Sequence, residues 1–307
     1  TGDPIFVKDE DCKLLLINDA FCKVFGLNRN IIIGTTLAEK VSKDEMEHFL
    51  AVDKQVLKDG NEIICEETLT ISGEDSRTIL TKKNRFTDSH GNYFIVGVIH
   101  DITERKQAEE REKSRAHVLE LITSGNALTV ILEAIIQVVE QKKPNMLCSI
   151  LLLDDTGEHL LSGAASSLPK FYNEAIDGIT IGIGVGSCGT AAFTNERVIV
   201  EDIQTHPYWR PYKELAKEAK LAACWSEPIR STKGDVLGTF AIYHREKNYP
   251  TPLDLTVIEQ TANLASIAIE KKQAEDKIKL AATVFSHARE GIIITDATGK
   301  ILKVNDR

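Results

Sequence analysis

Six cysteines are the residues of this chain best suited to redox or metal chemistry, because a thiolate is both a nucleophile and a soft metal ligand. They are dispersed along the sequence, at Cys12, Cys22, Cys65, Cys148, Cys188 and Cys224. No two of them form a Cys-x-x-Cys pair, and no spacing matches a set of metal ligands. Most of them have apolar neighbours. We therefore expect buried, reduced thiols, as in cytosolic proteins, and no metal site.

Two further motifs are similar to catalytic signatures but lack essential residues. Residues 182–192 are rich in glycine, yet the Lys-Ser/Thr pair that ends a phosphate-binding loop is missing. His287 stands in a stretch similar to the phosphoacceptor box of histidine kinases, but Ala288 follows it where that box has an acidic residue. We expect no catalytic residue in this chain.

The composition predicts a soluble protein that binds no nucleic acid. With 42% hydrophobic and 27% charged residues, the 307 residues suffice for two ordinary domains and their connections. The net charge is -9, and we expect the one compact basic run, residues 82–85, to be the solvated face of a strand. No apolar run approaches the ~18 residues of a membrane span. We expect a cytoplasmic location and no membrane contact within these residues.

Two internal repeats indicate that the chain is modular. Residues 104–110 and 270–276 are nearly identical charged segments, and residues 4–19 align without gaps on residues 291–306. The second copy runs out at Arg307, so we interpret the chain as an excerpt of a longer protein. The predicted divisions are a first domain at 1–103, a helical linker at 104–118, a second domain at 119–270, a linker at 271–283 and a truncated repeat of the first domain at 284–307.

The first domain shows the order two strands, small helices, three strands. Apolar runs at residues 5–7 and 14–17 flank a polar turn, which is typical of a hairpin. Asn18 offers a side-chain cap to a short helix that Gly26 ends. The remaining elements are predicted as a helix at 43–57 that Gly60 ends and strands at 63–71, 78–86 and 93–99.

This order, with residues 18–21 after the second strand and residues 98–105 at the close, resembles a PAS domain with its C-terminal PAC motif. The resemblance covers residues 1–103. It implies an α+β fold, in which helices cover one face of a five-stranded antiparallel sheet around a pocket that holds a ligand in some members. The signal-relay motif that caps the departing helix would consist of Asp101, Thr103 and Glu104.

The resemblance places three aromatic residues and one polar residue at this pocket, namely Phe6, Phe21, Phe25 and Asn18. The alternative is an interior filled by such side chains alone. Residues 31–41 lack the cysteine of flavin-binding PAS domains. Some members ligate haem from the helix that here carries His48, but a surface histidine is the better interpretation. No cofactor is evident, and we expect at most an unidentified small ligand.

Residues from about 120 to 270 resemble the GAF family. The resemblance rests on the glycine-rich turn at 182–192, the strand at 198–203 and the segments 223–229 and 236–241. It implies a mixed sheet between two layers of helices, an α/β/α sandwich, with a regulatory pocket and frequent dimerisation. The candidate pocket residues are Cys188, His206, Trp209 and Trp225. The alternative is that the two tryptophans only fill the core.

The cysteines match neither of two chemically active variants of the GAF family. No cysteine precedes a histidine, as the attachment site of bilin-binding members does. One subfamily reduces free methionine sulfoxide with closely spaced cysteines, and Cys148, Cys188 and Cys224 could converge in space. Their spacing departs from that subfamily, so we expect structural, buried cysteines.

A heptad seam follows the second domain. Apolar or small residues alternate at intervals of four and three, with charged residues between Ala268 and Ile278, at Val257, Thr261, Leu264, Ala268, Ile278, Ala282 and Phe285. A parallel two-helix coiled coil, and hence a homodimer, would use such a seam. The alternative is a helix that packs on the GAF sheet up to Ile269 and continues as a solvated linker.

These features predict a sensory region of a bacterial signalling protein, PAS then GAF then a second PAS. A small ligand or a conformational change would be relayed through dimeric helices to an output domain. Residues 280–296 and 223–226 are similar to those of proteins with GGDEF and EAL domains, so a diguanylate cyclase or phosphodiesterase acting on cyclic di-GMP is the first expectation. The alternative is a sensor histidine kinase of a two-component system.

Overall fold

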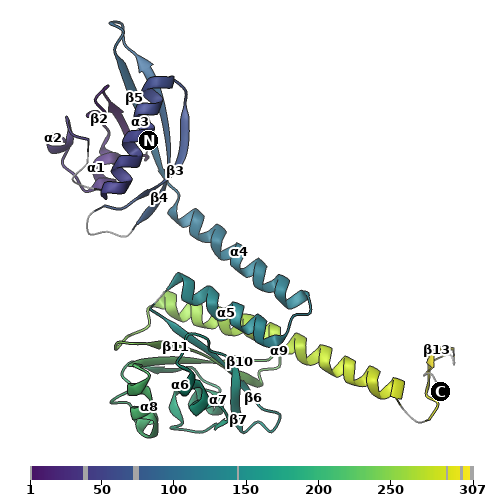
Figure 1. Cartoon of the computed structure of the whole chain (residues 1–307). Coiled ribbons are helices and arrows are strands. Elements are labelled where there is room, and N and C mark those ends of the chain that lie inside the picture. The colour runs from purple at the N-terminus through teal and green to yellow at the C-terminus, as the bar shows by residue number, and fades with distance from the viewer. Residues whose placement is uncertain are drawn as a thin grey trace. The chain divides into compact units, whose positions relative to one another are not determined.

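The computed structural model describes residues 2–36, 41–71, 76–143, 145–287, 290–297 and 300–304. The chain divides into two compact units, Thr1–Lys113 and Ser114–Arg307, whose elements are labelled in Figure 1. Each unit has its own sheet and its own hydrophobic interior.

The first unit is built on a five-stranded antiparallel sheet in the order β2-β1-β5-β4-β3. Its elements in chain order are β1 (Ile5–Lys8), β2 (Leu14–Ile17), α1 (Asp19–Phe25), α2 (Arg29–Ile32), α3 (Lys43–Asp59), β3 (Ile63–Leu69), β4 (Arg77–Thr87) and β5 (Tyr93–Asp101). Side chains from the three helices and from one face of the sheet form a single hydrophobic core. This is the architecture that the sequence predicts.

The ends of these helices follow from the residues that cap them. Asn18 precedes α1, and its side-chain oxygen accepts a hydrogen bond from the main-chain N–H of Phe21 at 3.0 Å. Gly26 ends α1 with a φ of 60°, a left-handed conformation that glycine adopts without steric cost. Gly60 ends α3 in the same way, with a φ of 72°. The predicted hairpin, cap and helix ends are confirmed.

The second unit is built on six strands in the order β8-β7-β6-β11-β10-β9. The helix α4 (Thr103–Thr123) begins in the first unit and ends in the second. The elements that follow are α5 (Leu128–Lys142), β6 (Leu147–Leu153), β7 (His159–Ala164), α6 (Lys170–Ile176), β8 (Ile179–Thr180), α7 (Gly186–Thr194), β9 (Val198–Val200), the 3-10 helix η1 (Pro207–Tyr212), α8 (Lys213–Glu218), β10 (Ala223–Arg230), β11 (Val236–His244) and α9 (Pro252–His287).

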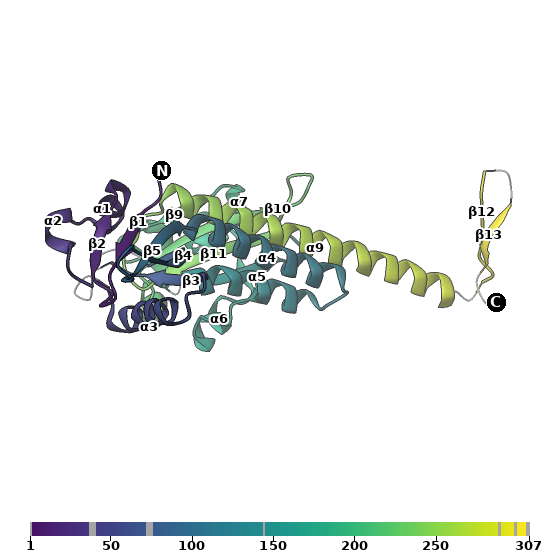
Figure 2. The ribbon, with the colours of Figure 1, turned by 90° about the horizontal axis from the view of Figure 1, so that it is seen from above.

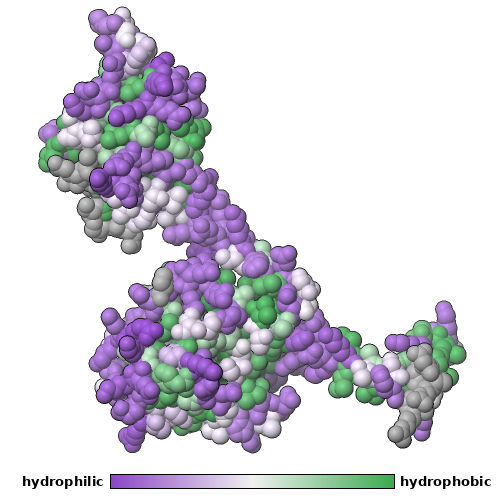
Figure 3. Space-filling model, viewed as in Figure 1, coloured by the Kyte–Doolittle hydropathy of each residue, from purple (hydrophilic) through white to green (hydrophobic). Residues whose placement is uncertain are grey.

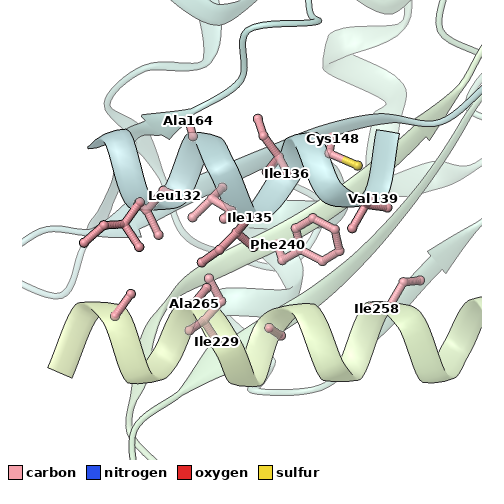
Figure 4. Packing of buried hydrophobic residues seen from close by; sticks show 14 of the residues in the cluster. Leu132, Ile135, Ile136, Val139, Cys148, Ala164, Ile229, Phe240, Ile258 and Ala265 are labelled. Carbon is pink, nitrogen blue, oxygen red and sulfur yellow. The ribbon is translucent and has the colours of Figure 1, made fainter. Parts of the chain in front are cut away.

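Helices cover both faces of this sheet, so the predicted α/β/α sandwich is confirmed. On one face α5 and α9 lie side by side, as both Figure 1 and Figure 2 show. Their apolar side chains pack against Ile229 of β10 and Phe240 of β11 (Figure 4). On the other face α6, α7, η1 and α8 enclose a second core.

The six-stranded sheet is antiparallel throughout, so the expected mixed sheet is wrong. Every pair of neighbouring strands, from β8 with β7 to β10 with β9, is antiparallel. The physical reason is the connectivity. Two hairpins, β6 with β7 and β10 with β11, supply most of the sheet, and a hairpin can join only antiparallel strands.

The helix α9 has two parts that differ in burial. From Ile258 to Ile269 it buries one side against the sheet. Beyond Ile269 none of its side chains is buried within the described helix, and Ile278 is 70% exposed. Apolar surface is visible toward the end of this helix in Figure 3, whereas α4 is hydrophilic along its middle. Packing on the sheet up to Ile269 is confirmed, and the dimeric seam beyond it stays a prediction.

A short antiparallel pair, β12 (Ile293–Thr295) and β13 (Ile301–Val304), follows α9. Its sequence aligns with that of β1 and β2 in the first unit. That it begins a second PAS domain stays a prediction. None of the described helices is both long enough and apolar enough to cross a bilayer.

Candidate functional site

The first candidate site is a cavity between the sheet of the first unit and the helices α1 and α3. Its volume, measured for the centres of water-sized spheres, is about 40 Å³, which is room for about three water molecules. The cavity is lined by the predicted residues Phe6, Phe21 and Phe25 and by Lys8, Thr36, Val41, Met46, Phe49, Glu67, Leu69, Ile79, Thr81, Lys83 and Ile99.

Asn18, the fourth residue predicted for this pocket, is not among the lining side chains. Its Oδ1 atom accepts hydrogen bonds from the main-chain N–H groups of Ile5 and Phe21, both at 3.0 Å. Its Nδ2 atom donates to the carbonyl oxygen of Asp3 at 2.7 Å. With every polar atom of its side chain used on the backbone, Asn18 joins β1 to α1 and positions Phe21.

Beside the aromatic residues lies a cluster of four buried charged side chains, Lys8, Asp53, Glu67 and Lys83. Asp53 contacts both lysines, with Oδ2 2.6 Å from Lys8 Nζ and Oδ1 3.0 Å from Lys83 Nζ. Lys83 Nζ also lies 3.4 Å from Glu67 Oε1. Two positive and two negative charges therefore balance each other, which offsets part of the cost of removing them from water.

The environment of Lys83 holds its ammonium group charged. Burial by itself lowers the pKa of Lys83, but the carboxylates of Asp53 and Glu67 outweigh it, and the pKa of Lys83 is raised above its ordinary value. A charged ammonium group therefore stands in the wall of the cavity, together with Lys8 and Glu67.

The expectation that residues 82–85 form a solvated strand face is wrong for Lys83, which is only 2% exposed. Successive side chains of a strand point to opposite faces, so Lys83 follows Thr81 inward and Lys82 stays outside. Thr81 Oγ1 is buried and has no hydrogen-bond partner among the described residues. The cavity wall thus presents an unused polar group next to the charged cluster.

The predicted relay motif joins the sheet to α4. Asp101 Oδ1 accepts a hydrogen bond from the main-chain N–H of Thr103 at 2.9 Å and so caps the helix. Thr103 Oγ1 accepts a hydrogen bond from the N–H of Thr78 at 2.9 Å and donates to the Thr78 carbonyl oxygen at 3.3 Å. Glu104 is exposed in the first turn, where a carboxylate interacts favourably with the helix N-terminus.

A second contact holds the same turn of α4. Lys106 Nζ lies 2.7 Å from Glu66 Oε2 on β3. Glu66 precedes the cavity residue Glu67, as Thr78 on β4 precedes the cavity residue Ile79. Both attachments of the helix are therefore made one residue away from the cavity wall.

The second candidate site is a cavity in the second unit, bounded by α7 and η1. Its volume on the same measure is about 30 Å³, room for about two water molecules. The cavity is lined by the predicted residues Cys188 and Trp209 and by Leu151, Tyr172, Ile176, Ile179, Val185, Gly186, Ser187, Gly189, Tyr212, Leu215 and Tyr243.

Polar groups meet along one side of this second cavity. Trp209 Nε1 donates a hydrogen bond to Ser187 Oγ at 3.0 Å, and Ser187 Oγ donates to the main-chain oxygen of Cys224 at 3.3 Å. Cys188 Sγ lies 3.7 Å from Tyr243 Oη. Burial raises the pKa of Tyr243 well above its ordinary value, so its hydroxyl keeps its proton and can donate.

The other two residues predicted for this pocket are not among its lining side chains. His206 precedes η1, where its Nδ1 atom accepts a hydrogen bond from the N–H of Tyr208 at 3.3 Å, and burial lowers its pKa. Trp225 belongs to the core on the opposite face, with its ring 4.3 Å from that of His244. Because side chains alternate along β10, Cys224 faces the cavity side and Trp225 faces α5 and α9.

Two of the three cysteines that could converge, Cys188 and Cys224, belong to the core on the cavity side of the sheet. Cys148 lies in the core on the other face. All six cysteines are free thiols. His48 is a surface residue, 57% exposed, as expected. No group of three histidine, cysteine, aspartate or glutamate side chains in the described part of the chain is placed to hold a metal ion.

The two units match two family models. Residues 1–107 match the PAS fold, and residues 125–270 match the GAF domain. The chain therefore carries a PAS domain followed by a GAF domain and is a sensory region of a signalling protein.

Two curated proteins are similar in sequence. The methyl sulfide methyltransferase-associated sensor of Methanosarcina acetivorans is 36% identical over 269 residues, which are 84% of this chain and 27% of that protein. The uncharacterized protein y4lL of Sinorhizobium fredii is 34% identical over 109 residues, 34% of this chain and 13% of that protein. The chain thus spans about a quarter or less of the length of these relatives.

Among solved structures, the GAF domain of an Acinetobacter phosphoenolpyruvate-protein phosphotransferase is 16% identical. The match covers 55% of this chain and 98% of that one, with a TM-score of 0.43.

Proposed function

We propose that this chain is the input region of a signalling protein, which converts the occupancy or the state of a small-molecule cavity into a change at its helical junctions. One observation carries the proposal. The strand β4 both lines the PAS cavity, through Ile79, Thr81 and Lys83, and holds the start of α4, through the hydrogen bonds of Thr78 to Thr103. A shift of this strand must therefore move the helix that leaves the domain.

The contact of Lys106 with Glu66 adds a second attachment, on the neighbouring strand β3. A ligand shifts the helix only to the extent that it binds one arrangement of these strands more tightly than another. The buried charges oppose small displacements of β4, because Lys83 contacts both Asp53 and Glu67 and loses part of its counter-charge if it moves away from either.

The second unit offers a route from α4 to α9. Val118 and Ile122, near the end of α4, belong to the hydrophobic core that α5 and α9 form with the sheet. Lys271 of α9 donates a hydrogen bond from Nζ to the carbonyl oxygen of Ile122 at 2.5 Å. A rotation of α4 would therefore reach α9 at the point where α9 leaves the sheet.

The part of α9 beyond Ile269 would carry this change onward in a homodimer. Its apolar residues are exposed in the single chain, Ile278 at 70%. In a parallel pair of helices the seam through Ile278, Ala282 and Phe285 would bury them. The charged residues before Ile278 weaken the packing of this seam, so the two helices of the dimer can adopt two alternative arrangements.

For the output domain, we propose a diguanylate cyclase or phosphodiesterase of the GGDEF/EAL type, because of the similarity of residues 280–296 and 223–226 to such proteins. The alternative is a sensor histidine kinase. One similar curated protein is named a sensor, which is compatible with either output. Assays of the full-length protein separate the two: conversion of GTP to cyclic di-GMP, or its breakdown, supports the first, and autophosphorylation from ATP supports the second.

The relay is tested by filling the PAS cavity. Ile79→Phe adds volume on the cavity face of β4, and Leu80→Phe adds the same kind of side chain on the opposite face, which is the matched control. We expect Ile79→Phe to change amide hydrogen exchange in the first turn of α4 and Leu80→Phe to leave it unchanged. Equal effects of the two variants would contradict the relay. Native mass spectrometry of the unmodified chain then reports retained small molecules and the number of subunits.

A further inference from the structure

The cavity of the PAS domain has an aromatic side and a polar side that adjoin each other. It is half open to solvent, which gives a ligand a way in. Phe21 stacks on Phe25 with ring centroids 4.4 Å apart and meets Phe6 edge to face at 6.0 Å. Lys8 Nζ lies 5.3 Å from the centroid of the Phe6 ring. A ligand that lies against these rings is therefore within a few ångströms of a charged group.

Thr81 offers a polar anchor on the same wall. It lines the cavity and is 1% exposed, and its Oγ1 atom has no hydrogen-bond partner among the described residues. Such a hydroxyl has lost its hydrogen bonds with water and has gained none in the fold. Because a hydroxyl both donates and accepts, it can pair with a hydroxyl or a carbonyl oxygen of a ligand.

The charges at the cavity are already paired with one another. Asp53 Oδ2 lies 2.6 Å from Lys8 Nζ, and Asp53 Oδ1 lies 3.0 Å from Lys83 Nζ. Glu67 Oε1 lies 3.4 Å from Lys83 Nζ. His48, which approaches Glu67 to 3.9 Å, is 57% exposed, so water screens its charge. The four buried side chains sum to zero charge, and a carboxylate or an amine placed among them would be buried without a counter-charge.

The two ammonium groups keep a hydrogen-bond donor each for a neutral oxygen. An ammonium group has three N–H bonds. Within the described residues, Lys83 contacts two carboxylates and Lys8 contacts one. Hydrogen bonds from charged donors are stronger than those between neutral groups, so an uncharged ligand oxygen gains from this wall without bringing a charge of its own.

We propose that the PAS cavity takes a small uncharged aromatic molecule with one polar oxygen, a phenol or an aryl ketone. Its oxygen bonds Thr81, and its ring lies against Phe6 and Phe21. A plain hydrocarbon leaves the Thr81 hydroxyl unpaired, and an aromatic acid or amine disturbs the charge balance. The inference rests on the proposed function, since it names the class of ligand for the same cavity.

Four probes of similar shape test the oxygen and the charge separately, namely phenol, toluene, benzoate and benzylammonium. Each is titrated at neutral pH into the 307-residue chain, labelled at the δ1-methyl groups of isoleucine for NMR. The methyl groups of Ile79 and Ile99 report binding in the PAS cavity, and that of Ile176 reports binding in the GAF cavity. We expect phenol to bind the PAS cavity about tenfold more tightly than any of the other three probes.

The role of the anchor is tested by Thr81→Val, which keeps the shape of the side chain and removes its hydroxyl group. This variant should bind phenol about fivefold more weakly and toluene with unchanged affinity. It should fold as stably as the unmodified chain, because the hydroxyl that it loses has no partner among the described residues. Thr87→Val makes the same substitution at an exposed position of the same strand, and this matched control should change neither affinity.

The inference is overturned if toluene, benzoate or benzylammonium binds as tightly as phenol, or if no probe shifts the Ile79 methyl signal up to its solubility limit. A failure of the relay looks different. Phenol would then bind with the expected preference and leave amide hydrogen exchange at the start of α4 unchanged, which keeps the ligand class and contradicts the relay. A change of that exchange in Ile79→Phe, without binding of phenol to the unmodified chain, would support the relay and contradict the ligand class.

Discussion

The Nζ atom of Lys8 lies 2.6 Å from Oδ2 of Asp53, and neither side chain reaches solvent to more than a few per cent. An ion pair this deep in a small domain is sensitive to the loss of either partner, because the remaining charge is then buried without compensation. Asp53 also contacts Lys83, so one carboxylate is shared by two buried ammonium groups.

Asp53→Asn should therefore be strongly destabilising. It leaves Lys8 without the one counter-charge that it has among the described residues, and it leaves Lys83 with Glu67 alone. We expect the PAS domain to lose about 3–5 kcal/mol of its free energy of unfolding. Urea unfolding followed by far-UV circular dichroism measures this loss. Asp59→Asn, at the exposed end of the same helix, is the control and should change the stability by less than about 0.5 kcal/mol. Similar losses of unfolding free energy in both variants would show that the buried charged cluster does not stabilise the domain more than an exposed carboxylate does.

Thr103→Ala should loosen the start of α4. It removes both hydrogen bonds to Thr78 and leaves a strand N–H unpaired, which should cost about 1–2 kcal/mol. Amide hydrogen exchange should then accelerate in the first turn of α4, and Thr103→Ser should restore protection. Thr123→Ala is the control at the other end of this helix, since Thr123 Oγ1 bonds only the carbonyl of Glu120 one turn earlier. If Thr103→Ala left amide exchange in α4 unchanged, the hydrogen bonds between Thr103 and Thr78 could not be what holds the start of α4 to the sheet.

Ile278→Glu should weaken a homodimer of this chain about tenfold or more, because it places a charge in the predicted apolar seam of α9. Sedimentation equilibrium measures the dissociation constant. Leu280→Glu is the matched control, since Leu280 is 65% exposed on the same helix but lies about 200° around it from Ile278. Dissociation by Leu280→Glu rather than by Ile278→Glu would assign the contact to another face of α9, and a monomer at all concentrations would contradict dimerisation through it.

The GAF domain should lose stability as the pH falls below about 6.5. Burial lowers the pKa of His244, and the nearby Asp254 carboxylate acts in the opposite direction. As the pH falls, the histidine is therefore protonated in the unfolded chain before it is protonated in the folded chain, which favours unfolding. Stability is therefore full above the ordinary pKa of histidine and declines below it. His244→Gln should flatten this decline, and His117→Gln, at an exposed histidine of α4, should not. Both tryptophans of the chain lie in the GAF domain, so tryptophan fluorescence reports its unfolding alone.

The boundaries of the elements could be predicted because the signals that set them are local. Asn18 caps the first turn of α1 and Gly26 ends its last turn, so these two residue types alone predict where the helix begins and ends. The three phenylalanines of the PAS cavity were placed by the resemblance to the PAS family, and the structure has all three in the cavity wall.

The charged cluster could not be predicted in this way. Asp53, Glu67 and Lys83 each look like surface residues, and only the packing of α3 across the sheet brings them together. Only the alternation along β4 indicates that Lys83 is buried, because Lys83 lies two and four residues after the inward-facing Thr81 and Ile79 and therefore on the same face of the strand.

The face of the sheet on which Trp225 lies could not be predicted for a different reason. All residues of β10 from Ala223 to Ile229 are buried, because helices cover both faces of the sheet. A strand of this kind shows no alternation between polar and apolar residues, so its sequence does not reveal which side chains face which core. That Cys224 lies in the same core as Cys188 could not be predicted for the same reason.

The separation of Cys224 from its neighbour Trp225 by the plane of the sheet has a consequence for how such a domain can diversify. Residues of the core on the cavity side and residues that pack against α9 alternate along β10 without overlapping. Substitutions on the cavity side can therefore accumulate, and alter what the domain detects, without touching the side chains that seat the exit helix. A lineage of such proteins is free to acquire new stimuli while it keeps the same connection to its output.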